Sequence, residues 1–552
     1  MRDSWRHRRA LAPKSRNCTT YTCKQIVSFK TKNLALFLNP KTIVLRPVRF
    51  NDSSVNNLLI SFRNVSIRHY NSLVFEGLDF EVEKGQNWAL LGKSGSGKST
   101  LLDFIMGKAS MARGEASYPY FDSYIHEHHQ DDPFFNRYKL MAQVSARHEF
   151  RNLSNTSDFY YQQRFNSCDS EDADTVANYL TAIKVVQADG FWTFKRVTER
   201  LKLLPLLDKQ LIKLSNGETK RLLIASALIR NPLLLLLDNP LNGLDVAARQ
   251  DFNELIHEIS DSGISLIMAT NPAEIPEAIS HVAVLDHGKM IRKVPSYQFN
   301  PDNLQTSASE KINREELLNL LSHEQWPIYN TIIGMENVSI RYGDKLILDQ
   351  VNWHMKQGER WMLIGHNGAG KSTLLSLING DNPQAFANKI TLFDQRKGSG
   401  ESIWEIKKKI GYVSPELFQY FPTGNTCLQV IESGFDDTLG LFRVSSKSKA
   451  ETSLRWMKLL GIEEYAGRMF RNVPVSIQRI CMLARAMVKN PVLLILDEPC
   501  LGLDFAQQEQ FKNLIDEICL ISNLSLIYVS HYQNEMPDCI TNALKLEQGR
   551  VV

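Results

Sequence analysis

Two glycine-rich segments of this 552-residue chain have the spacing of phosphate-binding loops. Both fit the pattern Gly-x-x-x-x-Gly-Lys-Ser, one at 92–99 and one at 365–372. Glycines let backbone N–H groups converge on phosphate oxygens, the lysine neutralises the β and γ phosphates, and the serine ligates Mg²⁺. One match could be a chance glycine-rich turn, but two in the same context argue against chance. The candidate nucleotide ligands are Gly92, Gly95, Gly97, Lys98, Ser99, Thr100, Gly365, Gly368, Gly370, Lys371, Ser372 and Thr373.

Short apolar runs predict the strands that position these loops. Residues 88–91 and 361–364 precede the loops, and each loop leads into a Thr-Leu-Leu helix start. Two further apolar runs, 233–237 and 492–496, are followed by Asp238 and Asp497. A buried strand that ends in an acid is the expected partner of a phosphate loop around Mg²⁺. The predicted metal ligands are therefore Ser99, Asp238, Ser372 and Asp497.

The chain contains two long copies of one pattern. Asn64–Arg68 recurs as Asn337–Arg341, 273 positions later, and Asp238 and Asp497 lie 259 positions apart. Repeats of this length are duplicated domains, and their strand–loop–helix order predicts parallel α/β architecture. The predicted boundaries are 58–298 for the first domain, 299–330 for a linker with one helical stretch at 315–321, and 331–552 for the second domain.

The overall composition is that of an ordinary globular protein. Hydrophobic residues make up 43% and charged residues 22% of the chain. The sequence holds no apolar run of about eighteen residues, so it predicts no membrane-spanning helix. Eight scattered cysteines without a Cys-x-x-Cys pair indicate reduced thiols and no zinc or iron–sulfur site.

The basic residues are concentrated at the start of the chain. Residues 1–50 contain twelve Lys or Arg and one acid, Asp3, which gives this leader a net charge of +11 and leaves −7 for the rest. An Arg-, Ser- and Thr-rich segment with almost no acids is typical of a mitochondrial transit peptide, so we expect a mitochondrial protein. A basic tail that contacts nucleic acid or anionic lipid, on a cytoplasmic protein, is the alternative.

Further motifs resemble those of the ATP-binding cassette superfamily. Leu214–Glu218 reads Leu-Ser-Asn-Gly-Glu, and x-Gly-Leu-Asp segments at 242–245 and 501–504 follow the two strands that end in an acid. In that family two cassettes close head to tail around two ATP molecules, and the Leu-Ser-x-Gly signature of one covers the nucleotide of the other. The resemblance covers 58–552. It implies two tandem nucleotide-binding domains that bind ATP and Mg²⁺, with signature residues Ser215, Gly217 and Glu218.

The two copies differ at the positions where the family places its catalytic groups. The second copy has Glu498 and His531, which the resemblance implies are the general base and the γ-phosphate sensor, whereas the first copy has Asn239 and Asn271. Asparagine cannot accept a proton at neutral pH, and general-base help is typically worth about 10²- to 10⁴-fold.

The signature is degenerate in the opposite copy. Pro474 and Ser476 of the second copy stand where the first copy has Ser215 and Gly217. Head-to-tail pairing therefore predicts one complete site, which joins the second copy's catalytic groups to the first copy's signature. The other site is damaged on both sides and is expected only to hold nucleotide. Slow turnover at both sites is the alternative.

Several further positions follow from the resemblance. Tyr342 falls where the family stacks an aromatic ring on adenine, although it could be only a half-buried strand residue; His69 or Tyr70 takes that place in the first copy. The family's Mg²⁺-sensing glutamine has no counterpart in 411–415, and Gln143 is expected inside a strand. The missing glutamine argues against ordinary transmission to a membrane subunit.

A histidine-rich stretch in the first copy is the remaining candidate metal site. His126, His128 and His129 stand beside Asp131 and Asp132. We interpret the stretch as a solvated polar loop in preference to a metal site.

The segment from 393 to 414 is similar to the bacterial ModF or PhrA (photorepair) type of tandem-cassette protein and to its uncharacterised fungal relatives. We favour a soluble twin-cassette ATPase that does conformational work on a protein partner the sequence does not identify. The alternatives are the ATP-hydrolysing subunit of a transporter with separate membrane subunits, and a nucleotide-gated module on the ribosome or nucleic acid. The acidic body argues against a large nucleic-acid-binding face.

Overall fold

The computed structural model describes residues 57–69, 72–145, 173–185, 190–241, 246–300, 313–321, 326–422, 424–441, 443, 445–530 and 535–552. The basic leader lies outside these ranges, so its targeting role stays a prediction. The chain separates into 1–52 and one compact unit at 53–552, which holds both copies. Within the described ranges, every helix is too short or too polar to cross a lipid bilayer.

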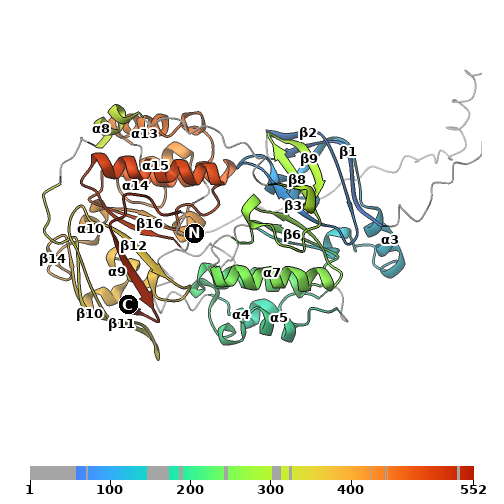
Figure 1. Ribbon diagram of the computed structural model, residues 1–552, viewed down its shortest axis with the longest axis horizontal. Helices are drawn as coiled ribbons and strands as arrows, with labels where there is room; N and C mark the ends of the chain where they lie inside the picture. Colours follow the sequence, from blue (N-terminus) through green and yellow to red (C-terminus); the bar gives the residue numbers. More distant parts are fainter. Residues whose placement is uncertain are drawn as a thin grey trace, which may run out of the picture. The chain divides into compact units, whose positions relative to one another are not determined.

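The first cassette, coloured blue to green in Figure 1, is built on a six-stranded sheet in the order β5-β6-β7-β3-β8-β9. Its neighbouring strands are parallel except for the antiparallel pair β8 and β9. A separate antiparallel sheet has the order β2-β1-β4. The strands are β1 (Leu58–His69), β2 (Ser72–Glu83), β3 (Asn87–Leu91), β4 (Ser110–Ser117), β5 (Met141–Val144), β6 (Leu234–Asp238), β7 (Ser265–Ala269), β8 (His281–Asp286) and β9 (Lys289–Pro295).

Six α-helices of the first cassette lie in the described ranges. They are α2 (Lys98–Ile105), α3 (Pro119–His128), α4 (Val176–Thr181), α5 (Phe194–Arg200), α6 (Asn216–Leu228) and α7 (Val246–Asp261). Short 3-10 helices are η2 (Arg137–Leu140), η4 (Leu204–Leu206), η5 (Leu211–Lys213), η6 (Pro272–Glu274) and η7 (Ser296–Gln298). Helix α2 starts directly after the first glycine-rich loop, as the sequence predicts.

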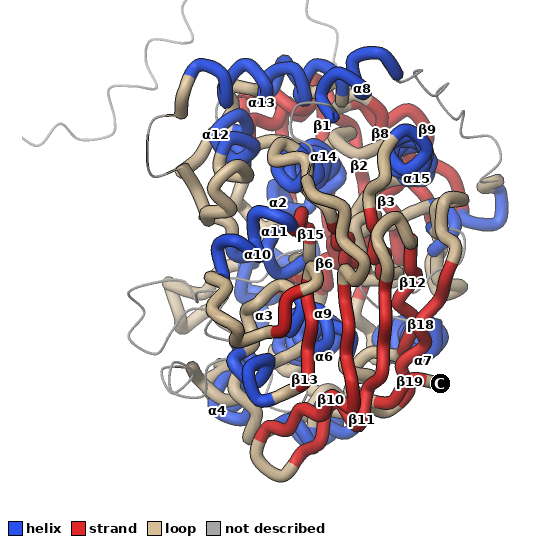
Figure 2. The backbone as a smooth tube through the Cα atoms, turned by 90° about the vertical axis from the view of Figure 1, so that its left-hand side faces the viewer, coloured by secondary structure: helices blue, strands red, loops and turns tan. Residues whose placement is uncertain are grey.

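The second cassette, coloured yellow to red in Figure 1, repeats this plan. Its six-stranded sheet has the order β15-β16-β17-β12-β18-β19, and a four-stranded antiparallel sheet has the order β11-β10-β13-β14. Figure 2 shows β10 and β11 running side by side as an antiparallel pair. The strands are β10 (Ile333–Tyr342), β11 (Lys345–Met355), β12 (Arg360–Gly365), β13 (Lys389–Leu392), β14 (Gln395–Arg396), β15 (Ile410–Val413), β16 (Leu493–Asp497), β17 (Ser525–Val529), β18 (Asn542–Glu547) and β19 (Arg550–Val551).

The helices of the second cassette include one from the predicted linker. They are α8 (Arg314–Leu321), α9 (Lys371–Ile378), α10 (Ile403–Lys409), α11 (Pro415–Tyr420), α12 (Cys427–Glu432), α13 (Lys447–Leu459), α14 (Val475–Met487) and α15 (Phe505–Ile521), with 3-10 helices η9 (Pro383–Ala387), η10 (Glu463–Tyr465) and η11 (Phe470–Asn472). Helix α8 is the helical stretch expected in the linker. Its Leu317 and Leu320 are buried in the second cassette's core, and its Glu316 pairs with Arg455 of α13 at 2.7 Å.

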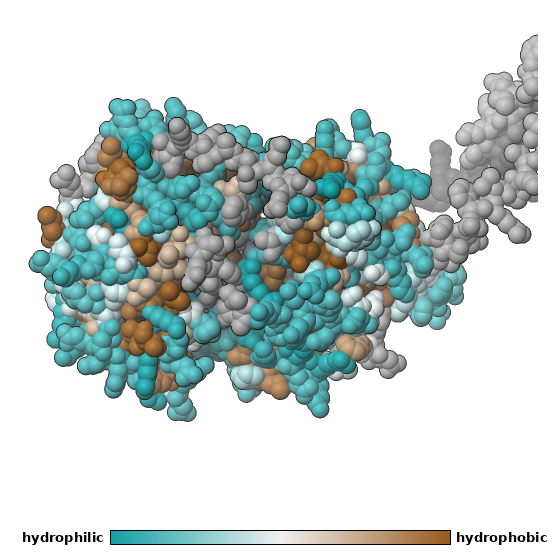
Figure 3. Space-filling view, in the orientation of Figure 1, coloured by the Kyte–Doolittle hydropathy of each residue, from teal (hydrophilic) through white to brown (hydrophobic). Residues whose placement is uncertain are grey.

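Apolar side chains fill both faces of each six-stranded sheet. In β6, Leu234 and Leu236 belong to one core cluster, and Leu235 and Leu237 belong to another. Successive residues of a strand point to opposite faces, so a continuous apolar run is required where both faces are covered. The predicted strands before Asp238 and Asp497 are therefore confirmed. Hydrophilic residues cover most of the face drawn in Figure 3.

The interpretation of the histidine-rich stretch as a loop is wrong for part of it. His126 and His128 lie in the last turn of α3, and the rings of His128 and Tyr124 stack with centroids 4.2 Å apart. His129 stacks on Phe135 at 3.6 Å. Tyr124 stands one helical turn before His128, so these two rings pack on the helix surface, a signal that a reading of the histidines alone misses.

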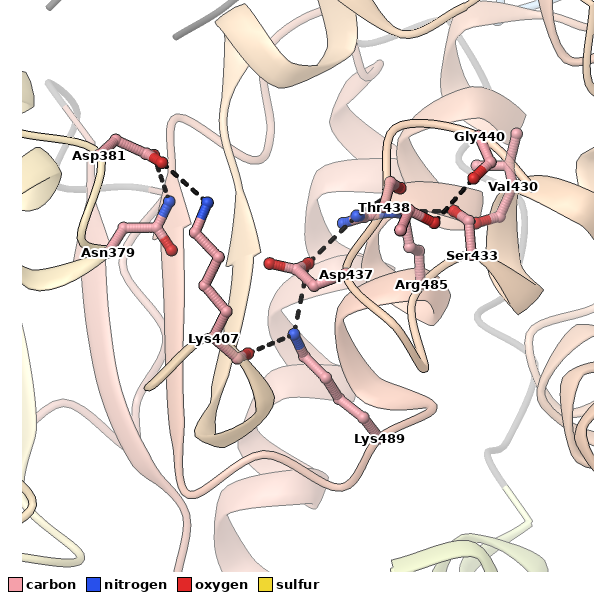
Figure 4. A network of polar contacts seen from close by, with 10 residues as sticks. All are labelled: Asn379, Asp381, Lys407, Val430, Ser433, Asp437, Thr438, Gly440, Arg485 and Lys489. Atoms are coloured by element: carbon pink, nitrogen blue, oxygen red, sulfur yellow. Dashed lines mark hydrogen bonds and ion pairs between the residues drawn. The ribbon is translucent and has the colours of Figure 1, made fainter. Parts of the chain in front are cut away.

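A buried polar network joins four segments of the second cassette (Figure 4). Asp381, which follows α9, accepts from Lys407 of α10 at 2.8 Å. The backbone carbonyl of Lys407 accepts from Lys489, whose ammonium also lies 3.3 Å from Asp437. Asp437 in turn accepts from Arg485 of α14 at 3.1 Å. Each buried charge thus has a partner, as burial requires.

Candidate functional site

The two phosphate loops have nearly the same backbone geometry. Gly97 and Gly370 cap the helices that follow, with φ of 104° and 105° in the left-handed region. A Cβ at Gly97 would lie 2.6 Å from the Phe75 ring, and one at Gly370 would lie 2.7 Å from Leu348. Both the backbone angle and the close packing therefore require glycine at these positions.

Both loop lysines fold back over their own loops. Lys98 donates to the carbonyls of Gly92 and Lys93, the latter at 2.9 Å, and Lys371 donates to Gly365 at 2.6 Å and His366 at 3.2 Å. Burial lowers the pKa of Lys98, against the opposing effect of Asp238 and Asp504. The carbonyl groups hold both ammonium groups next to the loop, where a bound phosphate would lie. A positive charge shielded from water attracts a phosphate more strongly there than it would in solvent.

The strand-end acid of the first cassette lies beside its loop, within hydrogen-bond reach of Ser99. Asp238 and Asp497 are the last residues of β6 and β16, and both are buried. Burial raises the pKa of Asp238, while a hydrogen bond with Ser99 and the charges of Lys220 and Lys98 oppose that rise. A carboxylate that shares a hydrogen bond with a serine hydroxyl is an oxygen donor set of the kind that suits Mg²⁺. Ser99 and Asp238 thus fit the predicted metal site.

Asn239 and Glu498 occupy the same backbone position in the two cassettes. Their φ angles are 46° and 47°, both in the left-handed region. The N–H of Asn239 donates to Ala269 at the end of β7, and that of Glu498 donates to Val529 at the end of β17, each at 2.9 Å. The Asn239 amide donates to Asp238 at 2.9 Å. The two sites thus differ here only in side-chain chemistry.

The signature segments begin equivalent helices with different caps. Ser215 caps α6, accepts from the N–H of Glu218 at 3.3 Å and donates its own N–H to that carboxylate at 2.7 Å. Lys209 pairs with Glu218 at 2.6 Å and, against the effect of burial, lowers its pKa. Pro474 caps α14 and makes no side-chain capping bond. A hydroxyl and an N–H are therefore lost at the second signature.

Two segments of the second cassette, about 400 residues further along the chain, contact the first phosphate loop. The N–H of Ser94 donates to the Asp504 carboxylate at 3.0 Å. A Cβ at Gly95 would lie 3.4 Å from Cγ of Pro474. Asp504 belongs to the x-Gly-Leu-Asp segment and Pro474 to the degenerate signature of the second cassette. The reciprocal segment, 242–245, lies outside the described residues, as do His531 and Tyr70.

The remaining predicted positions lie at strand ends. Asn271 caps η6 after β7 and donates to Glu274 at 3.4 Å. Tyr342 ends β10 and is 38% exposed, and its hydroxyl accepts from Asn382 at 2.9 Å. Gln143 lies within β5, as expected, and donates to Asp103 at 2.9 Å.

Two buried cations near the strand-end acids were missed by sequence reasoning. Lys220 of α6 and Arg479 of α14 are 6% and 4% exposed. Lys220 interacts electrostatically with Asp238, and Arg479 with Glu498. Each stands five residues after the cap of its helix, at equivalent positions of the two copies. A basic residue at the same position of both copies is the sequence pattern that could have indicated them.

Both copies match known proteins in sequence. The family model described as "ABC transporter" matches residues 75–242 and 348–501. The ABC transporter ATP-binding protein ModF of Escherichia coli is 31% identical over 481 residues, covering 84% of this chain and 91% of ModF. An uncharacterized ABC transporter ATP-binding protein of Schizosaccharomyces pombe is 29% identical and covers 89% of this chain and 99% of its own.

A solved structure shares the fold. It is described as a model of ribosome-bound archaeal Pelota and ABCE1, and it aligns with a TM-score of 0.56 at 18% identity over 89% of this chain and 78% of that one. The resemblance to tandem-cassette proteins of the ModF and fungal type is thus confirmed by the sequence comparisons.

Proposed function

Since this chain belongs to the ABC transporter family, we propose that it is a twin-cassette ATPase that hydrolyses ATP mainly at the second cassette. One observation carries the proposal: Asn239 and Glu498 share one backbone position, and only Glu498 can accept a proton. The second cassette's site thus keeps a general base that the first has lost. The first cassette's site would only hold nucleotide.

In the hydrolytic site each residue of this chain has a separate task. Lys371 would bind the β and γ phosphates and stabilise the charge that develops as the terminal phosphate leaves. Ser372 and Asp497 would hold Mg²⁺, which neutralises phosphate charge when bound. Glu498 would take the proton from the attacking water, and His531 would contact the γ phosphate.

The signature of the first cassette would complete that site. Ser215 and Gly217, at the start of α6, would bring a hydroxyl and close backbone to the γ phosphate, where the helix N-terminus adds positive potential. The contact of Ser94 with Asp504, and the approach of Gly95 to Pro474, support this head-to-tail pairing at the other, first-cassette site.

Replacement of Glu498 by Gln tests the proposal directly. We expect Glu498→Gln to lower the hydrolysis rate by about 10²- to 10⁴-fold, because general-base help is lost while ATP still binds. The matched variant Asn239→Ala should stay within about twofold of the parent rate, since the first site contributes little turnover. Rates are measured by phosphate release at saturating ATP. Near-equal losses from the two changes would contradict the one-site proposal.

The Glu498→Gln protein also serves as a trap for the partner. With ATP and Mg²⁺ bound, a hydrolysis-deficient sandwich stays closed and retains what it binds. We would tag the C-terminus and identify what copurifies. A soluble complex, ribosome or nucleic acid would favour conformational work away from membranes. A membrane protein would favour the second candidate function, a transporter's ATP-hydrolysing subunit, which the relatives' name "ABC transporter ATP-binding protein" supports.

We further propose that the leader directs the chain to mitochondria. Its charge of +11 supports this, because transit peptides are Arg-rich and poor in acids. Fusion of residues 1–50 to a fluorescent protein tests it. Diffuse cytoplasmic fluorescence would favour the alternative, a basic tail.

A further inference from the structure

Arg479 is a buried cation whose hydrogen-bonding capacity is largely unused. It is 4% exposed, and its Nε and Nη1 atoms are buried without an acceptor among the residues that the structure describes. The guanidinium lies over the ring of Phe418 on α11, 4.1 Å from its centroid. A buried charge without hydrogen bonds costs stability, so its presence calls for a functional explanation.

The charges around Arg479 belong to the hydrolytic site. Burial lowers its pKa to about 10, and the carboxylates of Glu498 and Glu416, followed by the Cys500 thiol and Asp497, oppose that decrease. Glu416 is buried on α11, directly after the segment where the family's glutamine is missing. The guanidinium thus packs against α11, and Glu498 and Glu416 are its main electrostatic partners.

The first cassette provides an internal comparison. Lys220 stands at the equivalent position, is 6% exposed and has only Asp238 as an electrostatic partner. The cassette that has Glu498 thus carries an arginine at this position, whereas the cassette that has Asn239 carries a lysine. Arginine differs from lysine in its planar fork of donors, which can hold a carboxylate in a fixed orientation.

We propose that Arg479 is a positioning residue that holds Glu498 in the orientation in which it accepts the proton of the attacking water. Phe418 and Glu416 fix the guanidinium from the other side. The proposal rests on the proposed function of Glu498 and deepens it. It also gives a role to the buried donors Nε and Nη1, which have no acceptor among the described residues: the Glu498 carboxylate would supply one in the orientation that accepts the proton of the attacking water.

Arg479→Met and Arg479→Lys separate this role from a structural one. We expect Arg479→Met to lower the single-turnover rate of ATP hydrolysis by up to about 10²-fold, the typical cost of misplacing a catalytic group, while the Kd for ATP changes by less than about threefold. Arg479→Lys should recover part of the rate. Thermal unfolding of each variant checks that it folds. A weaker ATP affinity with an unchanged rate would overturn the proposal.

Two controls complete the test. Lys220→Met, the matched variant, should lower the rate less than Arg479→Met does, because its electrostatic partner Asp238 belongs to the site with little turnover. In the Glu498→Gln background Arg479→Met should cause no further loss, because the residue acts through Glu498. Equal losses in both backgrounds, or equal losses from Lys220→Met and Arg479→Met, would overturn the role of Arg479. If Arg479→Met does not fold, Arg479→Lys is compared in the parent and the Glu498→Gln backgrounds instead. The parent rate in both Arg479→Lys and a folded Arg479→Gln variant would then overturn the role of Arg479. Failure of the proposed function is distinct, since it shows in Glu498→Gln alone.

Discussion

The two cassettes share their backbone and differ in the side chains that do chemistry. Their phosphate loops end at glycines with φ of 104° and 105°, and the residues after the strand-end acids have φ of 46° and 47°. At the second of these positions one cassette has an amide and the other a carboxylate. Around these positions the backbone is therefore the same in both cassettes, and the difference lies in whether the side chain can accept a proton.

The cassettes also differ in how they accommodate charge. In the second cassette Asp437 lies inside the network of Figure 4, between Arg485 and Lys489. In the first cassette the main ion cluster centres on Asp251, whose side chain is 33% exposed and lies 2.8 Å from both Arg200 and Lys202. Serine stands in the first cassette where the second has Arg485: Ser226 of α6 donates to the carbonyl of Leu223.

The largest expected effect comes from opening the buried network. Asp437→Asn should lower the free energy of unfolding of the second cassette by about 3–5 kcal/mol, because Arg485 and Lys489 are left buried without their anion. The matched change Asp251→Asn, in the half-exposed cluster, should cost only about 0–1 kcal/mol. Urea unfolding at neutral pH measures the free energy of unfolding of both variants. Equal losses would contradict the difference between the buried network and the half-exposed cluster.

The same pair of variants has an expected pH dependence. Burial alone would raise the pKa of Asp437, but Lys489 and Arg485 outweigh it and hold the pKa below its usual value. A depressed carboxyl pKa stabilises the fold above the unfolded-state pKa of about 3.9, and that contribution is lost as pH falls through the folded-state value. The difference between parent and Asp437→Asn should therefore shrink only in strongly acidic buffer.

The next effect tests which signature serves which site. Ser215→Arg should lower hydrolysis by about 10²-fold or more, because a bulky cation replaces a hydroxyl that faces the second cassette's nucleotide. Pro474→Arg, at the equivalent cap, should leave most hydrolysis intact, because it faces the first cassette's loop. Steady-state phosphate release measures both, with thermal unfolding as the check on folding. Loss in Pro474→Arg and not in Ser215→Arg would contradict the head-to-tail pairing.

Sequence reasoning identified the scaffold because its determinants are local. The loop around Gly97 and the apolar run before Asp238 follow from spacing and periodicity alone, and the structure has both. The repeat aligns Arg479 with Lys220, but spacing alone does not show that either side chain is buried. The burial of Arg479 depends on the packing of α14 against α11, and a basic residue on an otherwise amphipathic helix usually faces solvent. The stacking of His128 on Tyr124, by contrast, is a local pair one helical turn apart, which a reading of the histidines alone overlooks.

The smallest expected effect comes from restoring the missing base. Asn239→Glu in the Glu498→Gln background should leave hydrolysis close to that of Glu498→Gln alone, because the first site still faces Pro474 and Ser476 and still has Asn271 after β7. The control is Asn239→Asp, whose shorter carboxylate adds charge with less reach toward water. Single-turnover hydrolysis measures the residual rate. Recovery to the parent rate would contradict the view that several changes silence the first site. It would mean that Asn239 alone prevents hydrolysis there and that the proline cap of α14 does not. No recovery would locate the barrier in the signature, and further replacement of Pro474 by Ser and Ser476 by Gly should then raise the rate stepwise.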